Sequence, residues 1–179
     1  AGCKDNMDTG LILWFLLITP LLAAVLSLAL RSRRALMTLL ITAVSGCCLL
    51  GLALYLNLQY GPVVFAGRGW LFADGLSLFH LILMLTVYML STLYALVYFR
   101  EEAEHAEFTL NQARMFTGLW LSSLAAMSLV LVSNNLAIMW VGIEATTLLT
   151  AFLICLHRSP SSLEAMWKYL LICSVGVTF

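Results

Sequence analysis

The sequence predicts an all-α membrane protein, a polytopic bundle of about six transmembrane helices. Of its 179 residues, 63% are apolar and 10% are charged, against about 45–50% and about 25% in soluble domains. The mean hydropathy is +1.01, and several apolar runs reach the ~20 residues that span a bilayer core. The formal net charge is zero, and no basic run alternates with aromatic residues, so no nucleic-acid partner is expected. The expected surrounding is the lipid bilayer.

The first two predicted spans are separated by a short basic segment. Residues 1–10 are polar, and we expect a disordered extension there, ahead of a transmembrane helical bundle over residues 11–179. Met7 is the expected start of translation. Residues 11–30 are too long a run for a signal-peptide core and lack a basic flank, so they predict a transmembrane helix, kinked at Pro20. Arginines follow this run, and a second span is expected over residues 35–58.

Residues 60–74 differ in composition from the spans around them. Glycine and proline residues separate two short apolar pieces, residues 63–65 and 70–72. Turn residues between strand-like pieces predict an extended or hairpin loop at the membrane surface. Trp70 and Phe72 fit an interfacial belt of aromatic side chains. Asp74 is the expected N-cap of the third span, residues 76–99.

Three further apolar segments complete the predicted bundle. The fourth span covers residues 115–132, after a hydrophilic segment, residues 100–114, that is expected to be a solvated connector. Residues 133–135 predict a tight turn into the fifth span, residues 136–156. After a polar loop, a sixth apolar segment begins at Leu163 and is still running at Phe179. We therefore expect the front part of a longer chain, truncated in or after the sixth span.

Lysine and arginine residues predict the orientation in the membrane. The connections after the first, third and fifth spans carry six of them: Arg31, Arg33, Arg34, Arg100, Arg114 and Arg158. The other side carries only Lys4 and Arg68. Because basic loops stay in the cytoplasm, the N-terminus is expected outside.

Glu144 lies close to the middle of the predicted fifth span. A carboxylate at this depth costs roughly 2.5–3.5 kcal/mol on insertion scales, so it is normally partnered, protonated or in contact with water. One face of this helix is mostly small or polar, which is typical of contact between helices, and it predicts that Glu144 points into the bundle, served by Thr147 or by water. That face holds Ser133, Ala137, Trp140, Glu144, Thr147, Ala151 and Cys155. The alternative is a structural glutamate hydrogen-bonded to a neighbouring helix.

The sixth segment carries Glu164 and Lys168, four residues apart and therefore able to pair on one helix face. Lys168 is either a snorkelling lysine whose head reaches the cytoplasmic surface or a buried relay group. By helix rise, Glu144 lies ~18 Å from the cytoplasmic end of its helix and Lys168 only ~8 Å from it. A direct salt bridge between Glu144 and Lys168 is therefore not expected unless the helices are offset, whereas a link through water is feasible.

Two stretches carry a resemblance to a known family. Residues 134–148 (NNLAIMWVGIEATTL) and 161–169 (SSLEAMWKY) resemble the antiporter-like proton-channel subunits of respiratory complex I and membrane-bound hydrogenases, in particular hydrogenase-4 component F. Asp74-Gly75-Leu76-Ser77 is also similar, and the resemblance covers roughly residues 11–179. It implies that Glu144 and Lys168 belong to a chain of buried ionisable groups, supported by Glu164, Thr147 and Asp74. A lysine on a later, broken helix and a second inverted repeat would complete that chain.

The resemblance also implies a cellular setting and partners. It indicates a prokaryotic inner membrane, other membrane subunits and a peripheral redox module, with no cofactor in this chain. The subunit itself would be non-catalytic, since no nucleophile–base pair is visible. Scattered cysteines and histidines argue against a metal site. Two alternatives stay open, a multisubunit cation/proton antiporter or inorganic-carbon uptake subunit, and a structural membrane anchor without transport.

Overall fold

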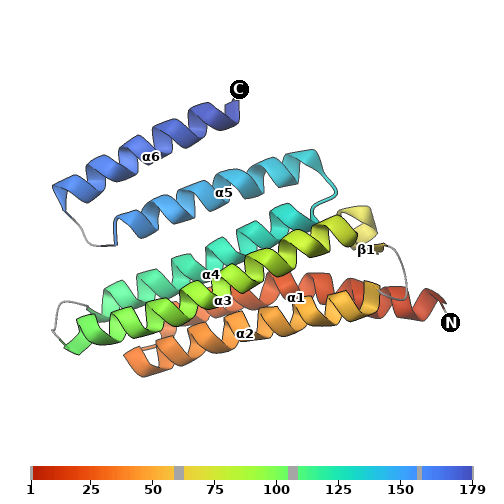
Figure 1. Ribbon diagram of the computed structural model, residues 1–179, viewed down its shortest axis with the longest axis horizontal. Coiled ribbons are helices and arrows are strands. Elements are labelled where there is room, and N and C mark those ends of the chain that lie inside the picture. The colour runs from red at the N-terminus through yellow and green to blue at the C-terminus, as the bar shows by residue number, and fades with distance from the viewer. Residues whose placement is uncertain (1, 59–62, 105–108, 157–158, 179) are drawn as a thin grey trace.

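The computed structural model describes residues 2–58, 63–104, 109–156 and 159–178. Within these ranges six long helices run alternately back and forth (Figure 1). On the left of the view α1, α3 and α5 end, and α2, α4 and α6 begin there. The helices are α1 (Gly2–Ala29), α2 (Arg33–Leu58), α3 (Gly75–Glu104), α4 (Leu110–Val132), α5 (Leu136–Ile154) and α6 (Pro160–Thr178). The predicted all-α polytopic bundle is confirmed.

Five of the described helices are long and apolar enough to cross a membrane. They are Gly10–Ala29, Arg33–Leu58, Gly75–Glu101, Leu110–Val132 and Leu136–Ile154. Helix α6 forms where the sixth span was expected but is not among these five. The reason is the polar first half of α6, which contains Glu164 and Lys168 as well as two serines.

Several helices extend beyond the predicted spans. Helix α1 begins at Gly2, in the segment expected to be a disordered extension, because each residue added to an existing helix gains a backbone hydrogen bond. The hydrophilic connector of residues 100–114 is also partly helical, since α3 continues to Glu104 and α4 begins at Leu110. Thr109 and Gln112 form a capping box at the start of α4. Residues 105–108 of this connector, and Arg158 in the loop after the fifth span, lie outside the described residues.

The first four helices form the core of the bundle, and α5 and α6 lie at its edge (Figure 1). Fully buried leucines from all four helices meet in the core: Leu13, Leu16, Leu36, Leu40, Leu81, Leu121 and Leu124. In the apolar span of α4, 50% of the residues are buried, whereas in that of α5 only 11% are buried. Large apolar side chains cover the outer faces of the helices, as expected for surfaces that contact lipid.

A β-hairpin follows α2, as the sequence predicted. Strands β1 (Val64–Ala66) and β2 (Leu71–Ala73) pair antiparallel, with Phe65 opposite Phe72. The connection is a short 3₁₀ helix, η1 (Gly67–Gly69), in which all three residues have positive φ. The predicted N-cap is confirmed, because the backbone N–H of Ser77 donates to Asp74 Oδ1 at 2.8 Å.

The hairpin is fastened to the turn between α4 and α5. The backbone of Leu71 pairs with that of Ser133, and the N–H of Asn134 donates to the Trp70 carbonyl at 2.9 Å. The side-chain amide of Asn134 also donates to the Gly69 carbonyl, at 2.8 Å. The hairpin and the start of α5 therefore form one structure at this end of the bundle.

The opposite end is held by the first turns of α4. Arg114 Nε donates to the carbonyl oxygen of Leu30, just after α1, at 2.7 Å. The side-chain amide of Gln112 donates to the carbonyl of Leu156, just after α5, at 3.4 Å. A basic side chain at the end of α1 is favourable, because the last carbonyls of a helix carry partial negative charge.

Candidate functional site

Asn135 fixes the start of α5, the helix that carries Glu144. Its side-chain oxygen accepts hydrogen bonds from the backbone N–H groups of Ala137 and Ile138, at 2.9 and 3.3 Å. Glu144 is the ninth of the 19 residues of α5 and therefore lies near the middle of the helix. Its side chain is half-buried. Among the described residues, no side chain or backbone group forms a hydrogen bond or salt bridge with it.

The predicted helix-contact face of α5 is covered only towards its C-terminal end. Ala151 is buried, but Trp140 is 54% exposed. Thr147 does not bond Glu144, because its hydroxyl donates to the Ile143 carbonyl within the same helix at 3.1 Å. In the described structure α5 makes its closest approach to α4 with another side, and the enclosure of Glu144 stays a prediction.

That closest approach is made by Gly142. A Cβ atom at this position would lie 2.6 Å from Val130 Cγ2 and 3.5 Å from the Ala126 carbonyl oxygen. A helix that presents a glycine can bring its backbone close to a neighbour. The glycine thus sets the rotation of α5, and this rotation places Glu144 away from α4.

Glu164 and Lys168 form the predicted ion pair on α6. Lys168 Nζ lies 2.5 Å from Glu164 Oε1. The side chain of Lys168 is 69% exposed and that of Glu164 is 66% exposed. The pair is therefore at the surface of the described part of the chain, and the choice between a snorkelling lysine and a relay group stays open. Such an i,i+4 pair stabilises a helix by only about 0.2–0.5 kcal/mol.

Helices α5 and α6 are joined by two polar contacts. The hydroxyl oxygens of Thr150 and Tyr169 lie 3.0 Å apart, and Cys155 Sγ donates to the Ser162 carbonyl at 3.3 Å. The contact between Cys155 and Ser162 gives a common reference height for the two helices. At 1.5 Å per residue, Glu144 lies ~17 Å from Cys155 along α5, and Lys168 lies ~9 Å from Ser162 along α6. This ~8 Å offset along the helix axes is too long for a direct ion pair and short enough for a water-bridged link.

Asp74 lies at the hairpin end of the bundle, at the start of α3 rather than beside Glu144 or Lys168. The backbone N–H of Ser77 donates to its carboxylate and so lowers the pKa of Asp74 below its ordinary value of 3.8. This carboxylate is an N-cap, and the structure does not bring it together with the other predicted site residues. In the described part of the chain, no group of three or more His, Cys, Asp or Glu side chains is arranged to hold a metal ion.

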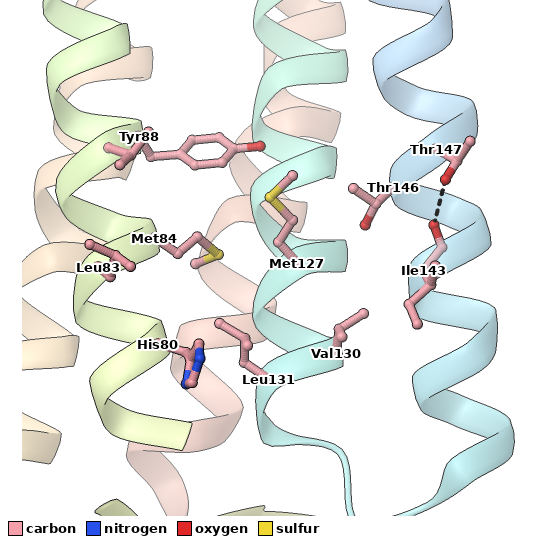
Figure 2. A pocket seen from close by; sticks show the side chains of 11 residues that line it. His80, Leu83, Met84, Tyr88, Met127, Val130, Leu131, Ile143, Thr146 and Thr147 are labelled. Carbon is pink, nitrogen blue, oxygen red and sulfur yellow. Dashed lines mark hydrogen bonds between the residues drawn. The ribbon is translucent and has the colours of Figure 1, made fainter. Parts of the chain in front are cut away.

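The sequence did not predict a groove of about 550 Å³ between α3, α4 and α5 (Figure 2). Eleven residues line this groove, which we call the lateral groove: His80, Leu83, Met84, Val87, Tyr88, Met127, Val130, Leu131, Ile143, Thr146 and Thr147. Its residues come from three helices, and only the packing of those helices brings them together. In the sequence, His80 was simply one of three scattered histidines.

Comparison with known proteins identifies relatives among membrane-complex subunits. No family model matches the chain. A hydrogenase-4 component F homolog of Methylacidiphilum infernorum is 32% identical over 104 residues, 58% of this chain and 22% of that protein. NADH-quinone oxidoreductase subunit N of Helicobacter hepaticus is 32% identical over 126 residues, 70% of this chain and 24% of that protein. The chain belongs to the antiporter-like subunit family.

As an antiporter-like subunit, the chain spans about a quarter of the length of the curated relatives it matches, with matched shares of 22% and 24%. The family resemblance is therefore confirmed. Within this antiporter-like chain, Glu144 is the acidic residue inside the α5 span. The neighbouring helix α6 supplies the Glu164–Lys168 pair.

Proposed function

We propose that this chain carries part of a proton-translocation path in a membrane subunit of a hydrogenase or complex I-like respiratory complex. The observation that carries the proposal is the position of Glu144, an ionisable group near the middle of the α5 span. Such residues are rare inside membranes because they are costly, and those that occur commonly belong to ion or proton pathways. The names of the two relatives, a hydrogenase component and an NADH-quinone oxidoreductase subunit, support the same assignment.

In this proposal Glu144 and Lys168 are the relay groups, and Glu164 holds Lys168 between transfers. Lys168 is bound to Glu164 in the structure, and its flexible four-carbon stem allows the ammonium group to turn towards Glu144. Water bridges the remaining distance along the helix axes. When Glu144 or Glu164 gains or loses a proton, the negative charge near Lys168 changes. This change drives Lys168 to exchange Glu164 for Glu144 as its partner.

The proposed setting is a prokaryotic inner membrane with the N-terminus outside. Other membrane subunits and a peripheral redox module are the proposed partners, and the redox chemistry belongs to that module. The chain itself needs no cofactor for this role.

The test is proton uptake into vesicles that contain the complete complex, driven by its redox partner. Glu144→Gln keeps the shape and hydrogen-bonding capacity of the side chain but removes its exchangeable proton, so most pumping is lost while assembly is normal. Glu144→Asp retains part of the activity, because water can bridge one missing methylene. Lys168→Ala has a milder effect. Glu101→Gln, which changes an exposed carboxylate at the end of α3, is the matched control and pumps as the unaltered protein does.

Two outcomes would point elsewhere. A Glu144→Gln complex that assembles and pumps normally makes Glu144 a structural residue and favours the membrane anchor. Proton uptake that responds to an imposed cation gradient without the redox partner favours the cation/proton antiporter.

A further inference from the structure

The lateral groove has the polarity of a site for a hydrocarbon chain. Its hydroxyl groups are occupied by the protein, since Thr146 donates to the Gly142 carbonyl at 2.8 Å and Thr147 donates to Ile143. The hydroxyl of Tyr88 lies 2.7 Å from Ser123 Oγ. The remaining surface consists mainly of aliphatic side chains and of Met84 and Met127, whose flexible thioethers adapt to an irregular ligand. A polar or aqueous occupant would find few free hydrogen-bonding groups along this length.

The groove also has the depth of one membrane leaflet. It runs from His80, near the hairpin end, to Tyr88, and these two residues mark its ends on α3 in Figure 2. Eight residues of helix separate them, a rise of ~12 Å. Half of a hydrocarbon core of ~30 Å is ~15 Å. A chain lying in the groove would thus extend from the membrane surface to near the midplane.

The wall of the groove on α3 is continuous with the lipid-facing surface. Leu83 and Val87 are each 55% exposed, and Leu90, one turn further along the same helix, is 62% exposed. A lipid can therefore enter sideways from the bilayer without a change in the helices. The volume of about 550 Å³ falls within the roughly 300–1,000 Å³ typical of small-molecule sites.

His80 supplies a polar group at the surface end of the groove. Its Nδ1 lies 2.9 Å from the Leu76 carbonyl oxygen, and because a carbonyl only accepts, Nδ1 carries the proton of this bond. In the neutral imidazole, Nε2 is then an acceptor. This arrangement suits a headgroup that donates hydrogen bonds, such as the ammonium of an ethanolamine lipid.

We propose that the lateral groove is a specific binding site for one phospholipid, with an acyl chain between α3, α4 and α5 and an ethanolamine headgroup at Nε2 of His80. The site differs from the Glu144–Lys168 relay in residues and in ligand. It does not depend on the proposed transport function.

The test uses the full-length protein in membranes and a phosphatidylethanolamine that carries a photoreactive diazirine in its acyl chain. After illumination, labelled peptides are mapped by mass spectrometry. Labelling is expected to concentrate at Met84 and Met127 rather than on the exposed leucines of α2. Val87→Trp fills the groove and lowers the labelling of Met127 several-fold, whereas Leu90→Trp, which places the same side chain beside the groove, leaves it unaltered.

A second comparison tests the headgroup. The ethanolamine probe is expected to label the groove several-fold more than a phosphatidylcholine probe with the same acyl chain, because choline has no hydrogen-bond donor for Nε2 of His80. His80→Leu removes this preference and keeps the acyl labelling. Even labelling of all exposed apolar faces, or no effect of Val87→Trp in a folded protein, would overturn the site. A photoreactive residue at position 87 that captures a polypeptide instead of lipid would show that another helix covers the groove.

Discussion

Gly142 on α5 packs directly against Val130 on α4. The space above the glycine is so small that a Cβ atom there would lie 2.6 Å from Val130 Cγ2, a distance at which either the valine side chain or the backbone must shift. Gly142 is also one of only two buried residues of α5. Packing of α5 onto the core thus depends on the absence of a side chain at this position.

Gly142→Ala is therefore expected to destabilise the contact between α4 and α5 by about 1–3 kcal/mol, the usual cost of overpacking. Thermal unfolding in detergent and proteolysis near α5 measure this effect. Gly46→Ala is the matched control, because no atom lies within 4 Å of the added Cβ and alanine favours a helix over glycine. Equal melting temperatures for the two variants would contradict the packing argument.

Asp74→Ala removes the cap of α3 and is expected to cost about 0.5–2 kcal/mol, whereas Asp74→Asn keeps the accepting oxygen. Both variants should also differ from the unaltered protein in how their stability depends on pH, because neither has a carboxylate at position 74. The Ser77 hydrogen bond lowers the pKa of Asp74, so its ionised form stabilises the folded state above the unfolded pKa. That stabilisation is lost as the pH falls through the pKa of Asp74 in the folded state, which lies below 3.8. Melting curves should show this loss in the unaltered protein only; its persistence in Asp74→Asn would assign it to another group.

Asn134→Ala removes the side-chain hydrogen bond to the Gly69 carbonyl, a loss of about 0.5–1.5 kcal/mol. Backbone amides of the hairpin should then exchange with deuterium faster, while those of α1 and α2 do not change. Asn57→Ala serves as the control, because the Asn57 amide bonds Ala53 in its own helix. Unchanged exchange in the hairpin would show that the backbone contacts alone hold it to the turn.

The positive charges at the α1–α2 connection predict that this end of the bundle faces the cytoplasm. In a variant without the five native cysteines, Ser32→Cys should react with an impermeant maleimide only after the membrane is opened. Asn134→Cys, an exposed position at the opposite end, should react in intact cells. The reverse pattern would invert the topology and place the hairpin in the cytoplasm.

Local features of this fold could be predicted from the sequence. Hydropathy and span length depend on consecutive residues, which is why the apolar runs matched helices α1 to α5. The Asp74 cap and the Glu164–Lys168 pair were also predictable, because a cap and an i,i+4 pair involve residues of one helix or its first turn.

Contacts between distant residues could not be predicted in this way. The Arg114–Leu30 hydrogen bond joins residues 84 positions apart, and the lateral groove exists only because three helices pack together. The packing around Glu144 could not be predicted for the same reason. Small and polar residues mark a face that can pack, but the closest contact at Gly142 decided which side of α5 meets α4. The relay roles of Glu144 and Lys168 and the N-out orientation stay predictions.

The attachment of the hairpin to the α4–α5 turn matters for synthesis of the protein. Gly69 leaves the ribosome 65 residues before Asn134, so the outer edge of β2 has formed before its partner turn exists. Until α4 has crossed the membrane, the backbone groups of that edge are open to any other nascent chain, and open strand edges readily join foreign strands. Arrival of Ser133 and Asn134 closes the edge, and it makes correct insertion of the fourth span the event that protects the hairpin from misassembly.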